Sequence, residues 1–158
     1  MQSGFRILFL VYFITHIPIT LLIDLQALLG DHYPPVLQNI YLWYTTSYND
    51  VLMTEKPIWL RSFITAELLF QLPFFFIAVY GFWMKKIWIR TPSIIYGAHT
   101  TTTVIPILSE IIFSTKNTLQ EKYILFGFYF PYFFVPFLLM VIMSLEQNPF
   151  ETKKKKSW

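Results

Sequence analysis

Four long runs of apolar residues dominate the sequence and limit the folds that are open to it. They cover residues 5–29, 62–83, 92–113 and 123–145, and each contains 22–25 residues. A helix needs about 20 apolar residues to cross the roughly 30 Å hydrocarbon core of a bilayer. The chain is 55% hydrophobic and 13% charged, which is more apolar than a soluble domain of 158 residues could bury. We therefore predict an all-α membrane protein, a single four-helix transmembrane domain with a basic tail over 146–158.

Basic residues indicate how such a bundle would be oriented. Eight of them fall on one side of the predicted spans and four on the other, and the positive-inside rule places the richer side in the cytosol. The richer side carries Arg6, Lys85, Lys86, Arg90 and Lys153 to Lys156, and the other side carries Lys56, Arg61, Lys116 and Lys122. Both termini are therefore expected in the cytosol and the long connection 30–57 in the lumen. Because these bases flank spans and lack interleaved stacking aromatics, a nucleic-acid partner is not expected.

Proline occurs in every predicted span. Each proline removes a backbone hydrogen-bond donor and crowds the carbonyl four residues earlier, so the helices are expected to kink near mid-membrane. The prolines are Pro18, Pro73, Pro106, Pro131 and Pro136. Kinks in all the helices favour a bundle that bows apart around an internal cavity, and irregular packing without a cavity is the alternative. In the luminal connection, apolar residues at helical spacing over 36–44 predict a short amphipathic helix that caps the bundle.

Two carboxylates, Asp24 and Glu67, lie inside these apolar runs. An acid at the centre of a membrane helix costs roughly 2.5–3.5 kcal/mol, and such residues usually line a cavity, a path or a ligand site. In the predicted orientation, each acid lies about five residues, or roughly 8 Å, from the luminal end of its helix. We therefore expect both side chains at the same depth on neighbouring helices.

Other polar side chains are predicted to join the acids in one layer of the luminal half. They are His16, Thr20, Gln71, Thr103, Tyr129 and Tyr132. A polar layer lined by phenylalanine, leucine and isoleucine suits an amphipathic ligand with one polar end. Asp50, in the luminal connection, is expected to cap a turn or to hold the cap in place.

No lysine or arginine is expected beside this polar layer. Two nearby carboxylates in a low-dielectric site should not both ionise, so we expect Glu67 to keep a proton and to hydrogen-bond an ionised Asp24. A cationic amine would then pair with that single anion. The alternative is a carboxyl pair that only fixes helix packing. We expect no cofactor and no metal, because His16 and Asp24 are two turns apart and no standard His/Glu ligand spacing occurs.

Several segments resemble those of a known membrane family. They are HIPITLLIDLQ at 16–26, AELLFQLPFF at 66–75, WIRTP at 88–92, HT at 99–100 with IPIL at 105–108, and YFPY at 129–132. In this order, and touching all the predicted spans, they resemble the EXPERA superfamily, to which the emopamil-binding sterol isomerases belong. The resemblance covers nearly the whole chain.

The resemblance implies a four-helix protein that binds sterols and cationic amphiphilic drugs in an intramembrane pocket. It also implies residence in the endoplasmic reticulum, with the nuclear envelope, lysosome and plasma membrane as further locations. Asp24 would pair with the ligand amine, Glu67 would be its protonated neighbour, and Asp50 would support the luminal side. The pocket would also be lined by Gln71, Tyr129 and Tyr132. The implied partners are cholesterol and oxysterols, membrane lipids, the Niemann–Pick cholesterol transporter and a second copy of the chain. Lys155 and Lys156 resemble a cytosolic dilysine retrieval signal, with topology or attraction to anionic lipid as the alternative.

Three functions are compatible with these residues. The first is a non-catalytic receptor for sterols and cationic amphiphilic amines that takes part in cholesterol homeostasis and trafficking. The second is a sterol Δ8-to-Δ7 isomerase, in which one carboxyl group protonates an alkene and the other removes a proton. The resemblance implies a histidine one turn before the first carboxylate in such isomerases, and this chain has Thr20 there. The third is a sterol-responsive scaffold for cholesterol-transport partners.

Overall fold

The computed structural model describes residues 1–151, and within that range the protein is entirely helical. Its α-helices are α1 (Ser3–Ile19), α2 (Gln26–Leu29), α3 (Pro35–Ser47), α4 (Val51–Glu55), α5 (Ile58–Ala66), α6 (Leu72–Trp83), α7 (Arg90–Phe113) and α8 (Leu119–Leu145). The shorter turns are the π turns η1 (Thr20–Asp24) and η3 (Glu67–Gln71) and the 3-10 turns η2 (Gly30–His32) and η4 (Ile87–Ile89). The predicted all-α fold class is confirmed. The predicted retrieval signal at Lys155 and Lys156 lies outside the described residues.

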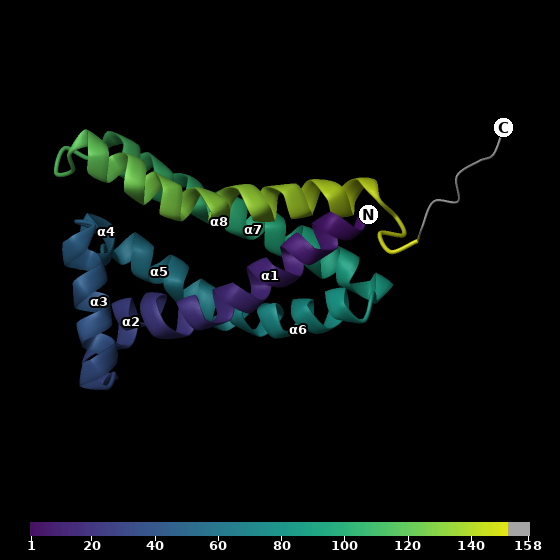
Figure 1. The fold of residues 1–158 in the computed structure, drawn as a ribbon, viewed down its shortest axis with the longest axis horizontal. Helices are drawn as coiled ribbons and strands as arrows, with labels where there is room; N and C mark the ends of the chain where they lie inside the picture. The colour runs from purple at the N-terminus through teal and green to yellow at the C-terminus, as the bar shows by residue number, and fades with distance from the viewer. Residues whose placement is uncertain (152–158) are drawn as a thin grey trace.

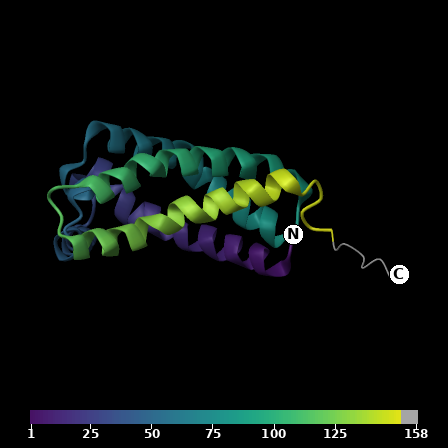
Figure 2. The ribbon, with the colours of Figure 1, turned by 90° about the horizontal axis from the view of Figure 1, so that it is seen from above.

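The helices form two layers that meet at one end of the molecule and separate at the other (Figure 1). α7 and α8 pack along each other in one layer, and α1 packs on α6 in the second. Figure 2 shows that the N-terminus and the connection from α6 to α7 lie at the same end, which we call the terminal end. α3 and α4 stand across the opposite end, which we call the cap end. The helix predicted over 36–44 is therefore confirmed as α3.

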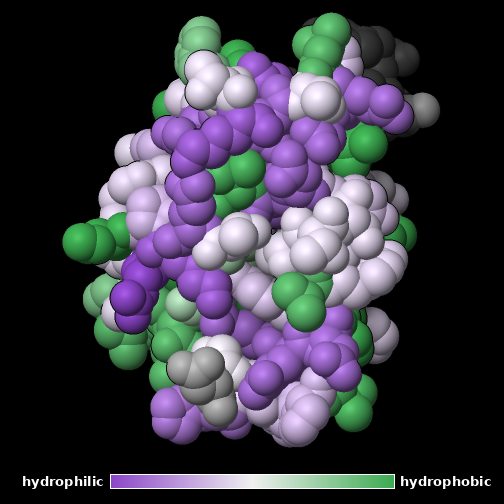
Figure 3. All heavy atoms as spheres, turned by 90° about the vertical axis from the view of Figure 1, so that its left-hand side faces the viewer, coloured by the Kyte–Doolittle hydropathy of each residue, from purple (hydrophilic) through white to green (hydrophobic). Residues whose placement is uncertain are grey.

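The outer surface is suited to lipid. Three helical segments of the described chain have the length and apolar composition to cross a membrane: Ser3–Leu29, Ile58–Trp83 and Leu119–Leu145. α7 has 24 residues, which is long enough, but a histidine and four consecutive threonines at 99–103 make it more polar. The protein is a membrane protein, and the fourth span over 92–113 stays a prediction. Figure 3 looks onto the cap end, where hydrophilic residues run across the face and many hydrophobic residues lie at its margins.

Each of the first two predicted spans is interrupted by a π turn. η1 joins α1 to α2 and η3 joins α5 to α6, so the helix continues through a wider turn without breaking. In η3 the Leu72 amide donates to the Glu67 carbonyl five residues earlier, directly before Pro73, which has no amide hydrogen to donate. In η1 the Leu25 amide donates to the Thr20 carbonyl at 2.9 Å in the same pattern. The acid-bearing segments are therefore π turns and not regular helix.

Buried apolar side chains form two separate clusters. The terminal cluster includes Phe9, Phe13, Phe75, Phe82, Tyr96, Leu139 and Met143. The cap cluster contains Ala27, Leu52, Met53, Leu60, Ile64, Ile107, Ile111 and Leu125. The terminal cluster joins the two layers directly, since the Phe13 ring on α1 lies 5.3 Å from the Tyr96 ring on α7. The protein is therefore packed at both ends, and polar groups occupy the space between.

The contact between α7 and α8 depends on a glycine. A Cβ atom added at Gly97 would lie 2.6 Å from the carbonyl oxygen of Pro136 and 2.7 Å from the Cβ of Met140. Small residues allow membrane helices to pack at such short range. Gly97 therefore sets the separation of these two helices.

We predict that Gly97→Ala destabilises the protein by about 1–3 kcal/mol, because the new methyl group meets backbone that cannot move independently of α8. Gly127→Ala is the matched control, since nothing lies within 4 Å of the Cβ that it adds to α8. Melting of the purified proteins in detergent, followed by tryptophan fluorescence, should show a lower midpoint for Gly97→Ala only. Equal midpoints for the two variants would contradict the close α7–α8 contact.

Candidate functional site

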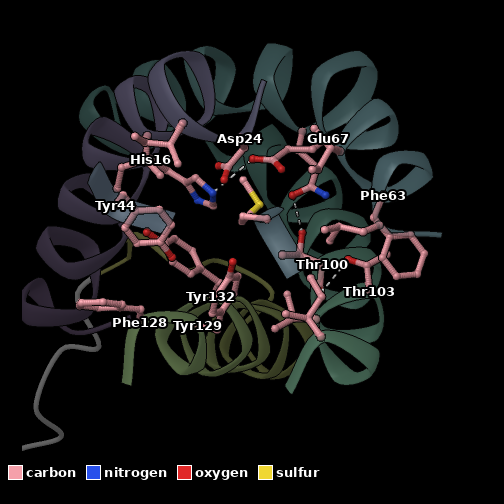
Figure 4. A pocket seen from close by; sticks show the side chains of 18 residues that line it. His16, Asp24, Tyr44, Phe63, Glu67, Thr100, Thr103, Phe128, Tyr129 and Tyr132 are labelled. Carbon is pink, nitrogen blue, oxygen red and sulfur yellow. Dashed lines mark hydrogen bonds and ion pairs between the residues drawn. The ribbon is translucent and has the colours of Figure 1, made fainter. Parts of the chain in front are cut away.

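A cavity of about 350 Å³ lies between the terminal cluster and the cap cluster. Side chains from both layers and from the cap line it, as Figure 4 shows. Most of the wall is apolar, with Ile19, Ile23, Leu60, Phe63 and Ile107 among its residues. The predicted internal cavity is therefore present, and its volume is within the range of small-molecule sites.

The polar residues predicted from the sequence to bind ligand all line this cavity. They are His16, Asp24, Glu67, Gln71, Thr103, Tyr129 and Tyr132. The cavity is also lined by Phe63, Phe128 and Thr100, which no signal in the sequence marked as site residues. Aromatic residues in a membrane helix carry no signal that distinguishes a cavity-facing side chain from a lipid-facing one. Thr100 belongs to a run of four threonines, and composition alone does not tell which of them faces the cavity.

The π turn η1 explains how the polar groups of the first span converge. In a regular helix, at about 100° per residue, His16 and Asp24 would point about 80° apart. A π turn accommodates one additional residue, which reduces that difference to about 20°. The turn therefore brings Asp24 back to the side of the helix that carries His16. One ligand atom each from His16, Asp24 and Glu67 lie within 4.8 Å of one another.

Glu67 has two polar neighbours on the first span that the sequence did not pair with it. The Thr20 hydroxyl donates to Glu67 Oε1 at 2.5 Å, and His16 Nε2 lies 3.5 Å from the same oxygen. One ligand atom each of Glu67 and Asp24 lie within 4.8 Å of each other, and the expected hydrogen bond from a protonated Glu67 to Asp24 stays a prediction. Thr20 is fully buried at the start of η1, where its short side chain faces η3. The Asp24 carboxylate, which has no hydrogen-bond donor in the described chain, is available to the cavity.

A second polar group borders the cavity on the side of α7. The Thr100 hydroxyl donates to Gln71 Oε1 at 3.1 Å, and the Thr103 hydroxyl donates to the backbone carbonyl of Thr100 at 3.1 Å. Because the Gln71 oxygen accepts from Thr100, its amide nitrogen remains as a donor for the cavity. The site therefore combines an acidic side with a neutral amide donor.

Asp50 connects the cap to the cavity wall. Its carboxylate caps α4 by accepting from the Met53 amide at 3.0 Å, and it also accepts from the hydroxyls of Tyr44 at 2.7 Å and Tyr129 at 2.8 Å. Both alternatives predicted for Asp50, a turn cap and a support of the cap, are therefore seen together. Burial and the nearby negative charge of Asp50 raise the pKa of the Tyr44 phenol above its ordinary value. Tyr44 therefore stays a protonated hydrogen-bond donor at neutral pH.

The profile of the EBP family, EXPERA (EXPanded EBP superfamily), matches residues 36–143. The chain belongs to the EXPERA family. The motif resemblance seen in the sequence is confirmed.

Several relatives are similar to this protein over almost the full chain. Sigma intracellular receptor 2 of Macaca fascicularis is 44% identical over 92% of this chain and 91% of its own length, and the Homo sapiens protein is 44% identical over 92% and 90%. Efficient mitochondria targeting-associated protein 19 of Saccharomyces cerevisiae is 30% identical over 85% of this chain and 94% of its own length. The chain is therefore a homologue of sigma-2 receptors within the EXPERA family.

We predict that Thr20→Val lowers the free energy of unfolding by about 1 kcal/mol, because it removes the buried donor to Glu67 without changing the side-chain shape. Thr65→Val is the matched control, since the Thr65 hydroxyl is exposed and bonds only to the Arg61 carbonyl of its own helix. Equilibrium unfolding in mixed micelles measures the free energy of unfolding of both variants. An equal loss in the two variants would show that the contact between Thr20 and Glu67 contributes nothing specific.

Proposed function

We propose that this protein is a non-catalytic intramembrane receptor for sterols and for amphiphiles that carry a basic amine. The observation that supports this most directly is the pair of carboxylates at one side of a mostly apolar cavity. Such a cavity matches a ligand with a hydrophobic body and one cationic end. The homology to sigma-2 receptors supports the same class of function.

In this proposal, Asp24 forms the ion pair with the ligand ammonium. Its carboxylate has no donor from the described residues, so an ammonium group would supply the hydrogen bonds that it lacks. Glu67 already accepts from Thr20. Among the described residues, neither lysine nor arginine lines the cavity, so two full negative charges would repel each other in a low-dielectric site. The carboxyl pair is therefore proposed to carry one negative charge, with Glu67 as the proton-bearing partner when an amine is bound to Asp24.

Sterols are proposed to use the same cavity through different contacts. A sterol has no charge for Asp24, but its hydroxyl group can accept from the Gln71 amide or donate to a carboxylate. The apolar wall between the two clusters would cover the ring system. On the basis of the resemblance, we also propose that the protein resides in the endoplasmic reticulum and has a role in cholesterol homeostasis. Its proposed partners are a second copy of the chain and the Niemann–Pick cholesterol transporter.

We predict that Asp24→Asn weakens the binding of a radiolabelled lipophilic amine by about 2–5 kcal/mol, because it removes a desolvated charge partner. Glu67→Gln should weaken binding less, since glutamine retains an acceptor for Thr20 and a donor for Asp24. Glu110→Gln is the matched control, because Glu110 is an exposed acid on α7 that does not line this cavity. Saturation binding to membranes that contain each variant measures the three affinities.

Full retention of affinity in a folded Asp24→Asn protein would contradict the ion pair. Equal losses in Asp24→Asn and Glu67→Gln would show that the charge lies on Glu67 instead. A loss in Glu110→Gln as large as that in Asp24→Asn would point to a general electrostatic effect and not to this cavity.

A sterol isomerase is the second candidate, because the cavity holds two carboxylates and a histidine close together. Thr20 weakens this alternative. It stands where the resemblance implies a histidine in the isomerases, and its hydroxyl is engaged by Glu67. Incubation of the purified protein with a Δ8 sterol is expected to leave the substrate unchanged. Formation of the Δ7 isomer, lost in Glu67→Gln, would establish the enzyme.

A further inference from the structure

The cavity contains a set of side chains whose chemistry extends beyond the binding of an amine. His16, Asp24 and Glu67 come from two helices and place one ligand atom each within 4.8 Å of one another. In a tetrahedral zinc site with bonds of roughly 2.0–2.1 Å, ligand atoms lie about 3.3–3.4 Å apart. The distance of 3.5 Å between His16 Nε2 and Glu67 Oε1 is already close to that spacing. Only a small movement of Asp24 would complete a three-ligand set.

The charge of the set also favours a divalent ion. In the part of the chain that the structure describes, the cavity lining includes two carboxylates and neither lysine nor arginine. A monovalent ammonium neutralises one carboxylate and requires a proton on the other. A divalent cation neutralises both and removes the need for that proton.

His16 is oriented for such a role. The residue is only 5% exposed, and its ring lies 4.6 Å from the Phe75 ring and 4.7 Å from the Tyr132 ring. This packing holds Nε2 toward Glu67, as Figure 4 shows for His16 beside the two acids. The other ring nitrogen, Nδ1, is buried and has no hydrogen-bond partner in the described chain. Among the described residues, no hydrogen bond to Nδ1 therefore competes with a metal ion for the His16 imidazole.

From these observations we infer that His16, Asp24 and Glu67 form a binding site for a divalent transition-metal ion of the zinc type, and that this ion competes with the amine for the cavity. One histidine and two carboxylates suit zinc, whereas magnesium and calcium require more oxygen ligands. Three protein ligands leave a fourth position that faces the cavity. The competition rests on the proposed amine function, but the metal site itself does not.

The same geometry limits the affinity. In strong metal sites, a histidine that binds through one nitrogen donates its other N–H to an acceptor, and loss of that acceptor typically weakens binding 10–100-fold. Here His16 Nδ1 has no such acceptor among the described residues. The ion is therefore exchangeable, which suits a regulatory competitor better than a structural metal.

The test uses the purified full-length chain in lipid nanodiscs and two independent readouts. Cobalt(II), a spectroscopic substitute for zinc, is added without amine and its visible absorption spectrum is recorded for tetrahedral coordination. Zinc is then titrated against a bound radiolabelled amine, with magnesium as the cation control. His16→Phe keeps the ring packing and removes the ligand nitrogen. His99→Phe is the matched control, because His99 does not line the cavity.

We expect the tetrahedral cobalt spectrum in the parent protein and in His99→Phe, and its loss in His16→Phe. We expect zinc to displace the amine and magnesium to leave it bound. Relative to each protein's own amine affinity, the zinc inhibition constant should rise at least about tenfold in His16→Phe. Equal zinc binding in His16→Phe and the parent protein, or equal displacement by magnesium, would overturn the metal site.

The two readouts separate this inference from the proposed function. A tetrahedral cobalt spectrum that depends on His16, in a protein that binds no amine, would support the metal site and contradict the amine receptor. Amine binding that depends on Asp24, with neither a cobalt spectrum nor zinc competition, would support the receptor and contradict the metal site.

Discussion

The hydrogen bond from Thr20 to Glu67 joins two π turns inside the apolar part of the protein. An acid in such a position is stabilised by polar groups of the protein or of a ligand, because lipid offers none. Thr20 provides that partner for Glu67 and thereby fixes how the first two long helices face each other. With Glu67 held in this way, Asp24 is left as the group that can interact with a ligand. The arrangement of the site therefore follows from one buried contact between η1 and η3.

Packing at the two ends preserves a cavity between them. At the terminal end, aromatic rings from α1, α6 and α7 bring the layers together. At the cap end, α3 and α4 stand across the opening, and Asp50 ties them to the wall through Tyr44 and Tyr129. The Tyr44 and Tyr129 side chains, which line the cavity, are thus held by Asp50, which does not line it.

Much of this organisation could be predicted from the sequence. The apolar runs, the amphipathic helix α3 and the polar layer containing Asp24 and Glu67 all correspond to features of the structure. The π turns could not be predicted, because hydrophobic periodicity does not reveal one additional residue in a turn. For that reason Thr20 was not recognised as the partner of Glu67, and the spacing of His16 and Asp24 did not look like a ligand motif. Phe63 and Phe128 were missed because an aromatic side chain is equally suited to lipid and to a cavity.

The most direct test of this account is an experimental structure of the protein with a lipophilic amine bound. We expect the amine nitrogen within about 3 Å of an Asp24 carboxylate oxygen, with the Thr20–Glu67 hydrogen bond and both π turns retained. An amine nitrogen placed away from both carboxylates, or a structure in which Asp24 points into lipid, would contradict the account.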